Sequence, residues 1–157
     1  MKKLLLAIAL LSLVSVSIAG CTSTQPNTQE NKDVVITLER TACFGTCPVY
    51  SLTIQGDGTV VYEGKDFVEV KGTAEKTISQ DQIDKLVTEF EKADYFSLKD
   101  SYTERTITDA PTVTTSISIS GKTKTIEHYR GDENAPERLT QLEDKIDEIV
   151  NSDQWIK

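Results

Sequence analysis

The sequence predicts an α+β domain, in which an antiparallel sheet of about five to six strands carries two helices on one face in the order β-β-β-β-α-β-β-α. Two observations lead to this prediction. Segments of alternating apolar and polar residues follow one another closely and are separated by glycine-containing turns, which is typical of strands joined by hairpins. Two later segments repeat apolar residues every three or four positions, as amphipathic helices do. Strands joined by hairpins pair antiparallel, and two helices can cover the apolar face of such a sheet.

The first twenty residues precede this domain and predict a lipoprotein signal peptide. The basic start Met1-Lys2-Lys3 is followed by an almost uninterrupted apolar run from Leu4 to Val16, and then by small residues. This is the pattern of a secretory signal. The run is also shorter than the roughly 20 residues that a transmembrane helix needs. We therefore expect residues 1–20 to be removed on export.

The end of this segment, Ile18-Ala19-Gly20-Cys21, resembles a bacterial lipobox. The resemblance implies that Cys21 is lipidated, becomes the first residue of the mature chain and attaches it to a membrane. Several acyl chains anchor a protein far more firmly than one. The expected location is the bacterial cell envelope. In a Gram-negative cell, Thr22 lacks the aspartate typical of inner-membrane retention, so the outer membrane, facing the periplasm, is favoured.

Residues 21–33 are expected to form the lipidated cysteine and a flexible tether. The residues after Cys21 in this segment include no aliphatic or aromatic side chain, so burial cannot offset the entropy lost on ordering them. Twelve such residues span roughly 20 Å as a flexible coil. A single α+β domain, residues 34–157, follows the tether.

Alternation of apolar and polar residues predicts four strands in the first half of this domain. They are expected at residues 34–39, 50–54, 59–63 and 67–70. Gly56-Asp57-Gly58 supplies the residues that a tight hairpin needs between the second and third strands. Gly64 is expected to end the third strand.

Two helices and a second hairpin account for the remainder. Ser79 and Gln82 form a capping box, which predicts a helix over roughly residues 80–93. Two strands joined at Gly121-Lys122 follow, the second ending near Tyr129. Pro136 suits the first turn of a helix. The apolar stripe of that helix is Leu139, Leu142, Ile146, Ile149 and Val150.

Cys43 and Cys47 lie between the first two strands and are expected to form a disulfide. In an exported protein they meet an oxidising compartment. Gly45, between them, permits the turn that brings their Cα atoms within bonding range. Closing so small a ring contributes only about 2 kcal/mol to stability. The bond would therefore stiffen a loop more than it would stabilise the fold.

The string Cys-x-Gly-x-Cys-Pro-x-Tyr over residues 43–50 is the most specific part of a resemblance to a family of bacterial domains known only as domain of unknown function 6438. The similarity covers about residues 34–156. Further shared elements are Gly56-Asp57-Gly58, Asp109-Ala110-Pro111, His128-Tyr129, Ala135-Pro136 and Trp155. The family has no assigned reaction, so the resemblance implies a domain boundary and an exported setting and gives no mechanism.

An alternative is a thiol-redox or copper-handling protein that uses Cys43, Cys47 and His128. Cys-x-x-x-Cys-Pro also resembles the motif of thioredoxin-like copper-delivery proteins, which complete the site with a distant histidine. Thiolates and imidazole suit copper. In those proteins, however, a helix follows the motif, whereas here Pro48 leads into a strand pattern. The main expectation is therefore no metal ligand, with these three residues as the alternative set.

Composition argues against several other functions. The net charge of -8 disfavours nucleic-acid binding, because an acidic surface repels phosphates. A single histidine excludes most zinc sites. There is no Gly-x-Ser-x-Gly elbow for a serine hydrolase. The acidic stretches near residues 81–84, 132–133 and 143–148 lack the spacing of a calcium loop and are expected to be solvated faces. No catalytic residue and no cofactor is predicted.

Several polar residues near strand ends are expected to converge at one end of the sheet, where loops carry binding chemistry. They are Glu39, Arg40, Tyr50, Tyr62, Tyr102 and His128. His128 shares its parity with Ile126 and is expected to be half-buried on the helix-covered face. We select Arg40, Tyr50 and His128 as possible binding residues. The sequence thus predicts a non-catalytic envelope lipoprotein that binds a protein, a peptidoglycan component or a small ligand through the cysteine loop and the adjacent strand ends.

Overall fold

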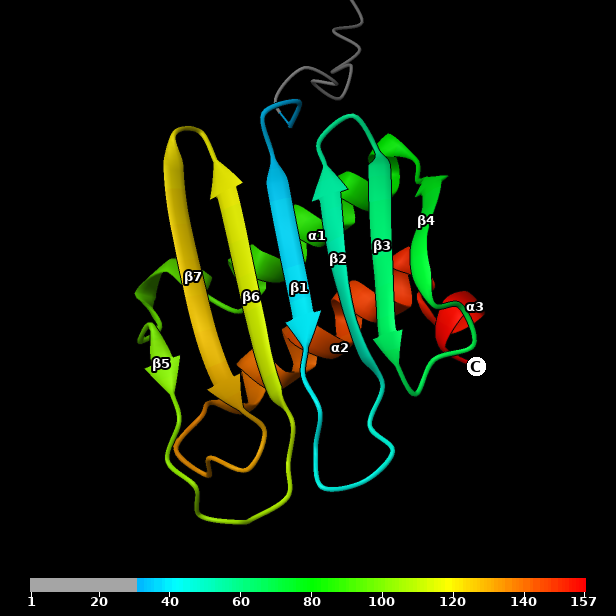
Figure 1. Ribbon diagram of the computed structural model, residues 1–157. Coiled ribbons are helices and arrows are strands. Elements are labelled where there is room, and N and C mark those ends of the chain that lie inside the picture. Colours follow the sequence, from blue (N-terminus) through cyan, green and yellow to red (C-terminus); the bar gives the residue numbers. More distant parts are fainter. Residues whose placement is uncertain (1–30) are drawn as a thin grey trace, which may run out of the picture.

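The computed structural model describes residues 31–157, which form one β-sheet with helices across one of its faces (Figure 1). The sheet has seven strands in the order β4-β3-β2-β1-β6-β7-β5. The strands are β1 (Val35–Arg40), β2 (Val49–Gln55), β3 (Thr59–Asp66), β4 (Gly72–Thr77), β5 (Ser101–Tyr102), β6 (Thr112–Ile119) and β7 (Lys122–Tyr129). Neighbouring strands are antiparallel except β5 and β7, which are parallel. The predicted α+β class is confirmed.

Two long helices cross the same face of the sheet (Figure 1). The helical elements are α1 (Gln80–Lys92), the 3-10 turn η1 (Tyr95–Ser97), α2 (Glu137–Val150) and α3 (Asp153–Ile156). The expected capping box begins α1: the Ser79 hydroxyl accepts from the backbone N–H of Gln82, and the Gln82 side chain accepts from the backbone N–H of Ser79. The buried side chains of α1 are Ile83, Leu86 and Phe90, which recur every three or four positions as the sequence predicts.

The β4 edge of the sheet differs from the prediction. The prediction of a strand at residues 67–70 is wrong, because the chain bends there and Phe67 has a positive φ of 51°. The preceding strand does not end at Gly64 but continues to Asp66. Strand β4 begins only at Gly72, and its sequence shows no apolar alternation because it is a mostly exposed edge strand.

The opposite edge was not predicted at all. Strand β5 has two residues, pairs with β7 in register Ser101↔Glu127 and Tyr102↔His128, and makes the sheet mixed. A two-residue strand is too short to show periodicity, which explains the difference between seven strands and the expected five to six. The short helix α3 was missed for the same reason.

The hydrophobic core lies between the sheet and the two long helices. Its side chains run from Val34 to Trp155 and come from the strands and the helices alike. At the C-terminal end, the Trp155 ring stacks on Tyr62 with ring centroids 4.7 Å apart, which fixes α3 against β3. Residues 31–157 therefore share one hydrophobic core, which a unit that folds by itself requires.

The two ends of the sheet have different connections. At the end that we call the hairpin end, the β2–β3 and β6–β7 turns lie with Asn31, whose carbonyl accepts from Val34 N–H at 3.1 Å (Figure 1). The opposite loop end holds residues 41–48, 103–111 and 130–136, at the bottom of Figure 1. Within residues 31–157, no helix combines the length and apolar character needed to cross a membrane.

Candidate functional site

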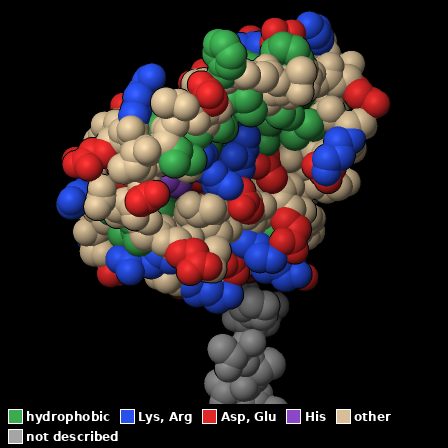
Figure 2. Space-filling model, turned by 90° about the horizontal axis from the view of Figure 1, so that it is seen from below, with side chains coloured by type: hydrophobic (Ala, Val, Ile, Leu, Met, Phe, Trp, Pro, Cys, Tyr) green, Lys and Arg blue, Asp and Glu red, His purple; other side chains and the backbone are tan. Residues whose placement is uncertain are grey.

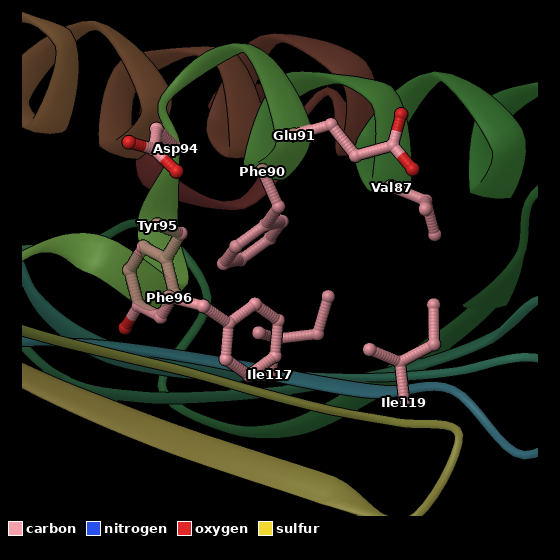
Figure 3. Close-up of a pocket in the computed structure, with 8 residues that line it drawn as sticks. All are labelled: Val87, Phe90, Glu91, Asp94, Tyr95, Phe96, Ile117 and Ile119. Atoms are coloured by element: carbon pink, nitrogen blue, oxygen red, sulfur yellow. The ribbon is translucent and has the colours of Figure 1, made fainter.

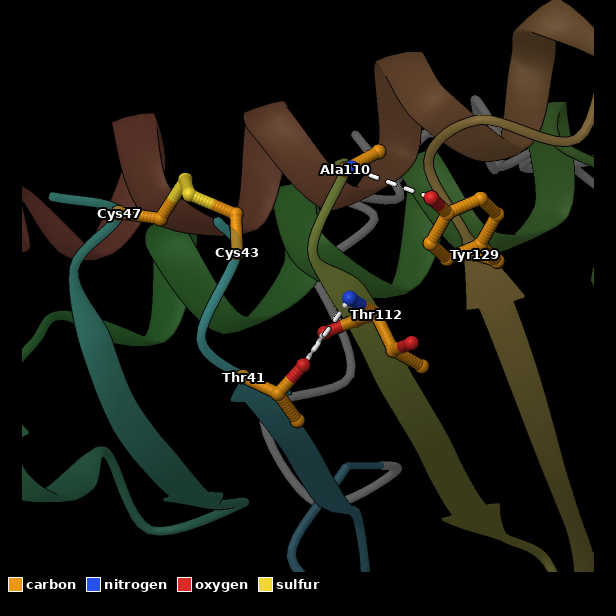
Figure 4. The surroundings of a disulfide bond; sticks show 6 residues. All are labelled: Thr41, Cys43, Cys47, Ala110, Thr112 and Tyr129. Atoms are coloured by element: carbon orange, nitrogen blue, oxygen red, sulfur yellow. Dashed lines mark hydrogen bonds between the residues drawn. A yellow bond between two sulfur atoms is a disulfide. The ribbon is translucent and has the colours of Figure 1, made fainter. Parts of the chain in front are cut away.

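The cysteine loop, residues 41–48, joins β1 to β2 at the loop end. Cys43 and Cys47 are joined by a disulfide with their Cα atoms 5.6 Å apart, as the sequence predicts (Figure 4). Between them, Phe44 is 89% exposed. A short, covalently closed turn therefore presents an aromatic side chain to solvent.

Hydrogen bonds hold the base of this loop and of its neighbour (Figure 4). The backbone N–H of Thr41 donates to the Thr112 carbonyl at 3.0 Å, and the Thr112 N–H donates to the Thr41 hydroxyl at 3.0 Å. Farther along the sheet, the Tyr129 hydroxyl accepts from the Ala110 N–H at 3.2 Å and donates to the Ile107 carbonyl at 3.0 Å. Both loops are thus fixed to the ends of β1, β6 and β7.

Arg40 and Tyr50 pair directly across β1 and β2, and both side chains reach Asp147 on α2. The Arg40 guanidinium donates to Asp147 Oδ2 from Nε at 2.9 Å and from Nη2 at 2.7 Å. The Tyr50 hydroxyl donates to Asp147 Oδ1 at 2.7 Å. The hydroxyl of Ser152 donates to the same oxygen at 2.6 Å. This carboxylate therefore fastens the base of the cysteine loop to α2.

Burial and charge change the acidity of this pair. Burial alone would lower the pKa of Arg40, but the Asp147 carboxylate outweighs burial and raises that pKa above its ordinary value. Burial raises the pKa of Tyr50, and the adjacent Asp147 charge raises it further. Arg40 is thus held in its charged form and Tyr50 in its neutral form.

His128 lies two strands from Arg40 and contacts another carboxylate of α2, the buried Glu143. Nδ1 of His128 lies 2.8 Å from Glu143 Oε1, and Arg130 Nη1 donates to Glu143 Oε2 at 2.7 Å. Glu143 is 0% exposed and His128 is nearly as buried. His128 faces the helix-covered side of the sheet, as expected, but is more deeply buried than the half-buried position predicted.

The two arginines meet at α2. Asp144 Oδ1 accepts from Arg40 Nη2 at 3.3 Å and from Arg130 Nη2 at 3.2 Å. Arg40 Nη2 also donates to the backbone carbonyl of Glu143 at 3.2 Å. We refer to Arg40, Arg130, Glu143, Asp144 and Asp147 as the loop-end ion cluster. It connects β1 and the residue after β7 to one helix.

Two acidic stretches expected to be solvated faces are corrected here. Glu143 is fully buried, because on α2 it lies beside Leu139, Leu142 and Ile146 on the face that packs against the sheet. Asp132 is also buried, and its carboxylate accepts the backbone N–H groups of Glu104 and Asn134 at 2.9 Å. These N–H bonds outweigh the opposing effect of burial and lower the pKa of Asp132.

Some of the residues expected to converge do so. Arg40 pairs with Val113 and Val113 pairs with His128, so two strand spacings separate Arg40 from His128, about 10 Å between Cα atoms. Tyr102 on β5 approaches His128 with ring centroids 6.4 Å apart. Tyr50 is beside Arg40, as described above.

Tyr62 and Glu39, which were also expected to converge, lie elsewhere. Tyr62 packs against Trp155 and donates its hydroxyl to the Val70 carbonyl at 3.1 Å. Glu39 pairs with Lys65 at 3.2 Å and, as the neighbour of Arg40 in β1, faces the opposite side of the sheet. Sequence reasoning missed Arg130, Glu143 and Asp147, of which only Glu143 gave a signal, its place on the α2 apolar stripe.

The paired charges at the loop end have a structural role, since they join the strands to α2. Among residues 31–157 no buried side-chain nitrogen or oxygen lacks a hydrogen-bond partner, so the charges are compensated. The same residues contain no group of three or more His, Cys, Asp or Glu placed to hold a metal ion, and Cys43, Cys47 and His128 do not form one.

The surface over these paired charges carries both hydrophobic and charged side chains. Figure 2 views the molecule from the loop end and shows hydrophobic side chains gathered beside interleaved basic and acidic side chains. Phe44 and Ile107 are large hydrophobic side chains in the loops of this end, and Ile107 is 51% exposed. The part of this end that is free to contact another molecule is therefore the loop surface, because the side chains of the loop-end ion cluster are already paired with one another.

Comparison with known proteins gives one result. The sequence model of a family described as a domain of unknown function, DUF6438, matches residues 34–150. No curated protein is similar enough to the chain to count as a match.

Proposed function

The chain belongs to the family of the domain of unknown function DUF6438, and from that premise we propose that it is a lipid-anchored bacterial envelope protein that binds another envelope protein through its cysteine loop. The family supplies no reaction, so the proposal depends on geometry. The observation that carries it is the exposure of Phe44 on a loop closed by a disulfide.

An aromatic side chain in this position suits protein recognition. Aromatic residues are frequent hot spots of protein interfaces, because they bury a large area in a partner's pocket. Ordering a flexible loop on binding costs free energy, and a loop that is already ordered avoids this cost. Here the disulfide closes the loop, and Thr41 and Arg40 fasten its base to β6 and α2.

The position of the loop agrees with anchoring at the other end. Asn31, through which the domain joins the preceding residues, lies at the hairpin end, away from the cysteine loop (Figure 1). If Cys21 carries the lipid, residues 22–33 would hold the hairpin end toward the membrane, at a reach of roughly 20 Å. The loop end then faces away from the bilayer, where a partner can reach it.

Crosslinking from the loop tests the binding proposal. A photoreactive phenylalanine analogue replaces Phe44 in the full-length chain in cells, and the same analogue replaces Lys122, an exposed residue at the hairpin end, as control. We expect a discrete crosslinked protein from position 44 that is absent from position 122. It should weaken in the Cys43→Ser, Cys47→Ser double variant. Equal products from both positions, or none from position 44, would contradict the proposal.

Labelling tests the anchor separately. Cells that express the full chain are fed radiolabelled palmitate, and we expect the label to enter this protein and to disappear in Cys21→Ser, which should also leave the membrane fraction. Retention of the label in that variant would exclude lipidation at Cys21 and leave the crosslinking result intact.

Thiol titration separates binding from the thiol-redox or copper alternative. In the unreduced domain, residues 31–157, the disulfide leaves no free thiol, and reduction should lower the free energy of unfolding by about 2 kcal/mol, because it opens a small ring. Uptake of one Cu(I) by the reduced domain, weakened by His128→Ala, would instead favour copper handling.

A further inference from the structure

A cavity of about 340 Å³ lies away from the loop end, between the last turns of α1, the turn η1 and strand β6 (Figure 3). Six apolar or aromatic side chains form most of its lining. They are Val87, Phe90, Tyr95, Phe96, Ile117 and Ile119. This volume and this composition fall in the range of sites that bind small molecules.

The fold leaves this space open for local reasons. Helix α1 ends at Lys92, and Asp94 takes a left-handed φ of 47°, so the chain turns away from the helix axis into η1. Ile119, at the end of β6, is only partly covered, and Phe96 is 45% exposed. In Figure 3 the Phe90 and Val87 side chains point from the helix toward the isoleucines of the sheet, with space between them.

One wall of the cavity is fixed in place. The Tyr95 hydroxyl donates to the backbone carbonyl of Thr115 at 2.7 Å, and its ring meets Phe90 edge-on with centroids 4.9 Å apart. Burial also raises the pKa of Tyr95, so this hydroxyl stays protonated. The cavity is therefore held open by packed and hydrogen-bonded side chains.

The charges in the lining are both negative. Glu91 and Asp94 lie on the helix side of the cavity (Figure 3). The Asp94 carboxylate accepts the Ser97 hydroxyl. The Glu91 carboxylate has no hydrogen bond or ion pair with any residue between 31 and 157, since its neighbour Lys92 pairs with Glu89. On the sheet side, Lys124 lies opposite Ile117, but its ammonium is already paired with Asp100 at 2.6 Å.

We propose that this cavity binds a small amphiphilic cation, with an alkyl or aryl group seated between Phe90 and Ile119 and an ammonium group at the carboxylate of Glu91. The apolar lining favours a hydrocarbon body. The free carboxylate and the net charge of the chain, -8, favour a cationic head and disfavour an anionic one.

Titration with n-octylammonium, n-octanoate and n-octanol tests this in the domain of residues 31–157. The readout is the movement of backbone amide signals from residues that line the cavity. We expect octylammonium to bind saturably and more tightly than the other two probes. If Lys122, an exposed lysine opposite Ile119, governed the site, octanoate would bind best and the proposal would be overturned.

Charge variants sharpen the test. Glu91→Gln should weaken octylammonium binding by about two- to fivefold, the effect of one partly exposed ion pair. Glu127→Gln, which removes the same charge from an exposed residue of β7, should leave the affinity unchanged. Equal affinity in Glu91→Gln and the unmodified domain, or no saturable binding of octylammonium, would refute the proposal. Thermal unfolding of each variant verifies that it is folded.

Discussion

Glu143 is the side chain whose position matters most at the scale of single residues. A fully buried carboxylate is costly unless its charge is compensated, and here His128 and Arg130 each approach one of its oxygens. Its neighbour Asp144 accepts bonds from both arginines but is largely exposed. Two adjacent acids on α2 therefore play different roles, since one is part of the core and the other is at its surface.

This difference predicts unequal costs. Glu143→Ala leaves Arg130 and His128 without their buried partner and should lower the free energy of unfolding by about 3 kcal/mol. Asp144→Asn removes only exposed pairs and should cost less than about 1 kcal/mol. Urea unfolding of residues 31–157 measures both. Equal losses would show that burial of Glu143 is unimportant.

Buried tyrosines predict how stability depends on alkaline pH. Burial raises the pKa of Tyr50, Tyr62 and Tyr95 above the ordinary value near 10, so the folded state keeps their protons while the unfolded state releases them. The stabilisation is complete below about pH 10 and is lost as the pH rises above it. The loss should approach about 1.4 kcal/mol per pH unit for each tyrosine that stays neutral in the folded state.

Unfolding measured between pH 9 and pH 12 tests this. Tyr50→Phe and Tyr95→Phe each remove one such group and should make the alkaline decline less steep, even though each variant is less stable at neutral pH. An unchanged slope in both variants would mean that these hydroxyls do not carry the effect.

At the scale of elements, tight turns decide how strands meet helices. Gly58, in the β2–β3 hairpin, has a positive φ of 93°, and a Cβ there would lie 2.3 Å from the Ile78 carbonyl oxygen. Ile78 N–H donates to the Gly58 carbonyl at 2.9 Å, so this glycine joins the hairpin to the residues that lead into α1. Gly121, in the β6–β7 hairpin, has a similar φ of 74° but open space around it.

The two glycines form a matched pair for mutation. Gly121→Ala should cost about 1 kcal/mol, because only the left-handed backbone is unfavourable for alanine. Gly58→Ala carries the same backbone cost and also forces the Ile78 carbonyl to move, so its loss should exceed that of Gly121→Ala by about 1 kcal/mol, roughly the worth of a hydrogen bond. Thermal unfolding compares them. A smaller effect at Gly58 would contradict this account of the contact.

At the scale of the whole molecule, the two ends of the sheet carry different segments of the chain. Asn31, which follows the preceding residues, lies at the hairpin end, whereas the exposed Phe44 lies at the loop end. Under the proposed function, the hairpin end lies nearer the membrane and the cysteine loop farther from it. The cavity described above is lined by Ile117 and Ile119, in the last part of β6. This strand runs toward the hairpin end (Figure 1).

This orientation predicts a difference in distance to the bilayer. A fluorophore is attached through an introduced azide-bearing residue at position 122 or at position 46, in the full-length chain bound to vesicles that contain an acceptor dye. Energy transfer should be stronger from position 122 than from position 46, because the strands separate these positions by about 20 Å or more. Equal or reversed transfer would disprove the orientation without affecting the fold.

How much of the structure the sequence could predict depends on how far apart in the chain the interacting residues lie. The α+β class, the start of α1 and the Cys43–Cys47 disulfide were predictable, because alternation, capping and a three-residue spacing are local properties. The edge strands β4 and β5 could not be predicted, because a polar strand and a strand of two residues show no alternation of apolar and polar residues. The convergence of Arg40, Tyr50 and His128 followed partly from strand parity.

The sequence by itself therefore determined the elements that are built from near neighbours, and its first 21 residues supply the prediction of export and lipidation, which lie outside the described residues. Only the tertiary structure decided that Asp147 joins Arg40 and Tyr50, that Glu143 is buried beside Arg130, and that a cavity opens beside β6. The physical reason is that burial and ion pairing depend on which elements become neighbours in space. Arg40 and Asp147 are 107 positions apart, a distance at which no pattern in the chain pairs them.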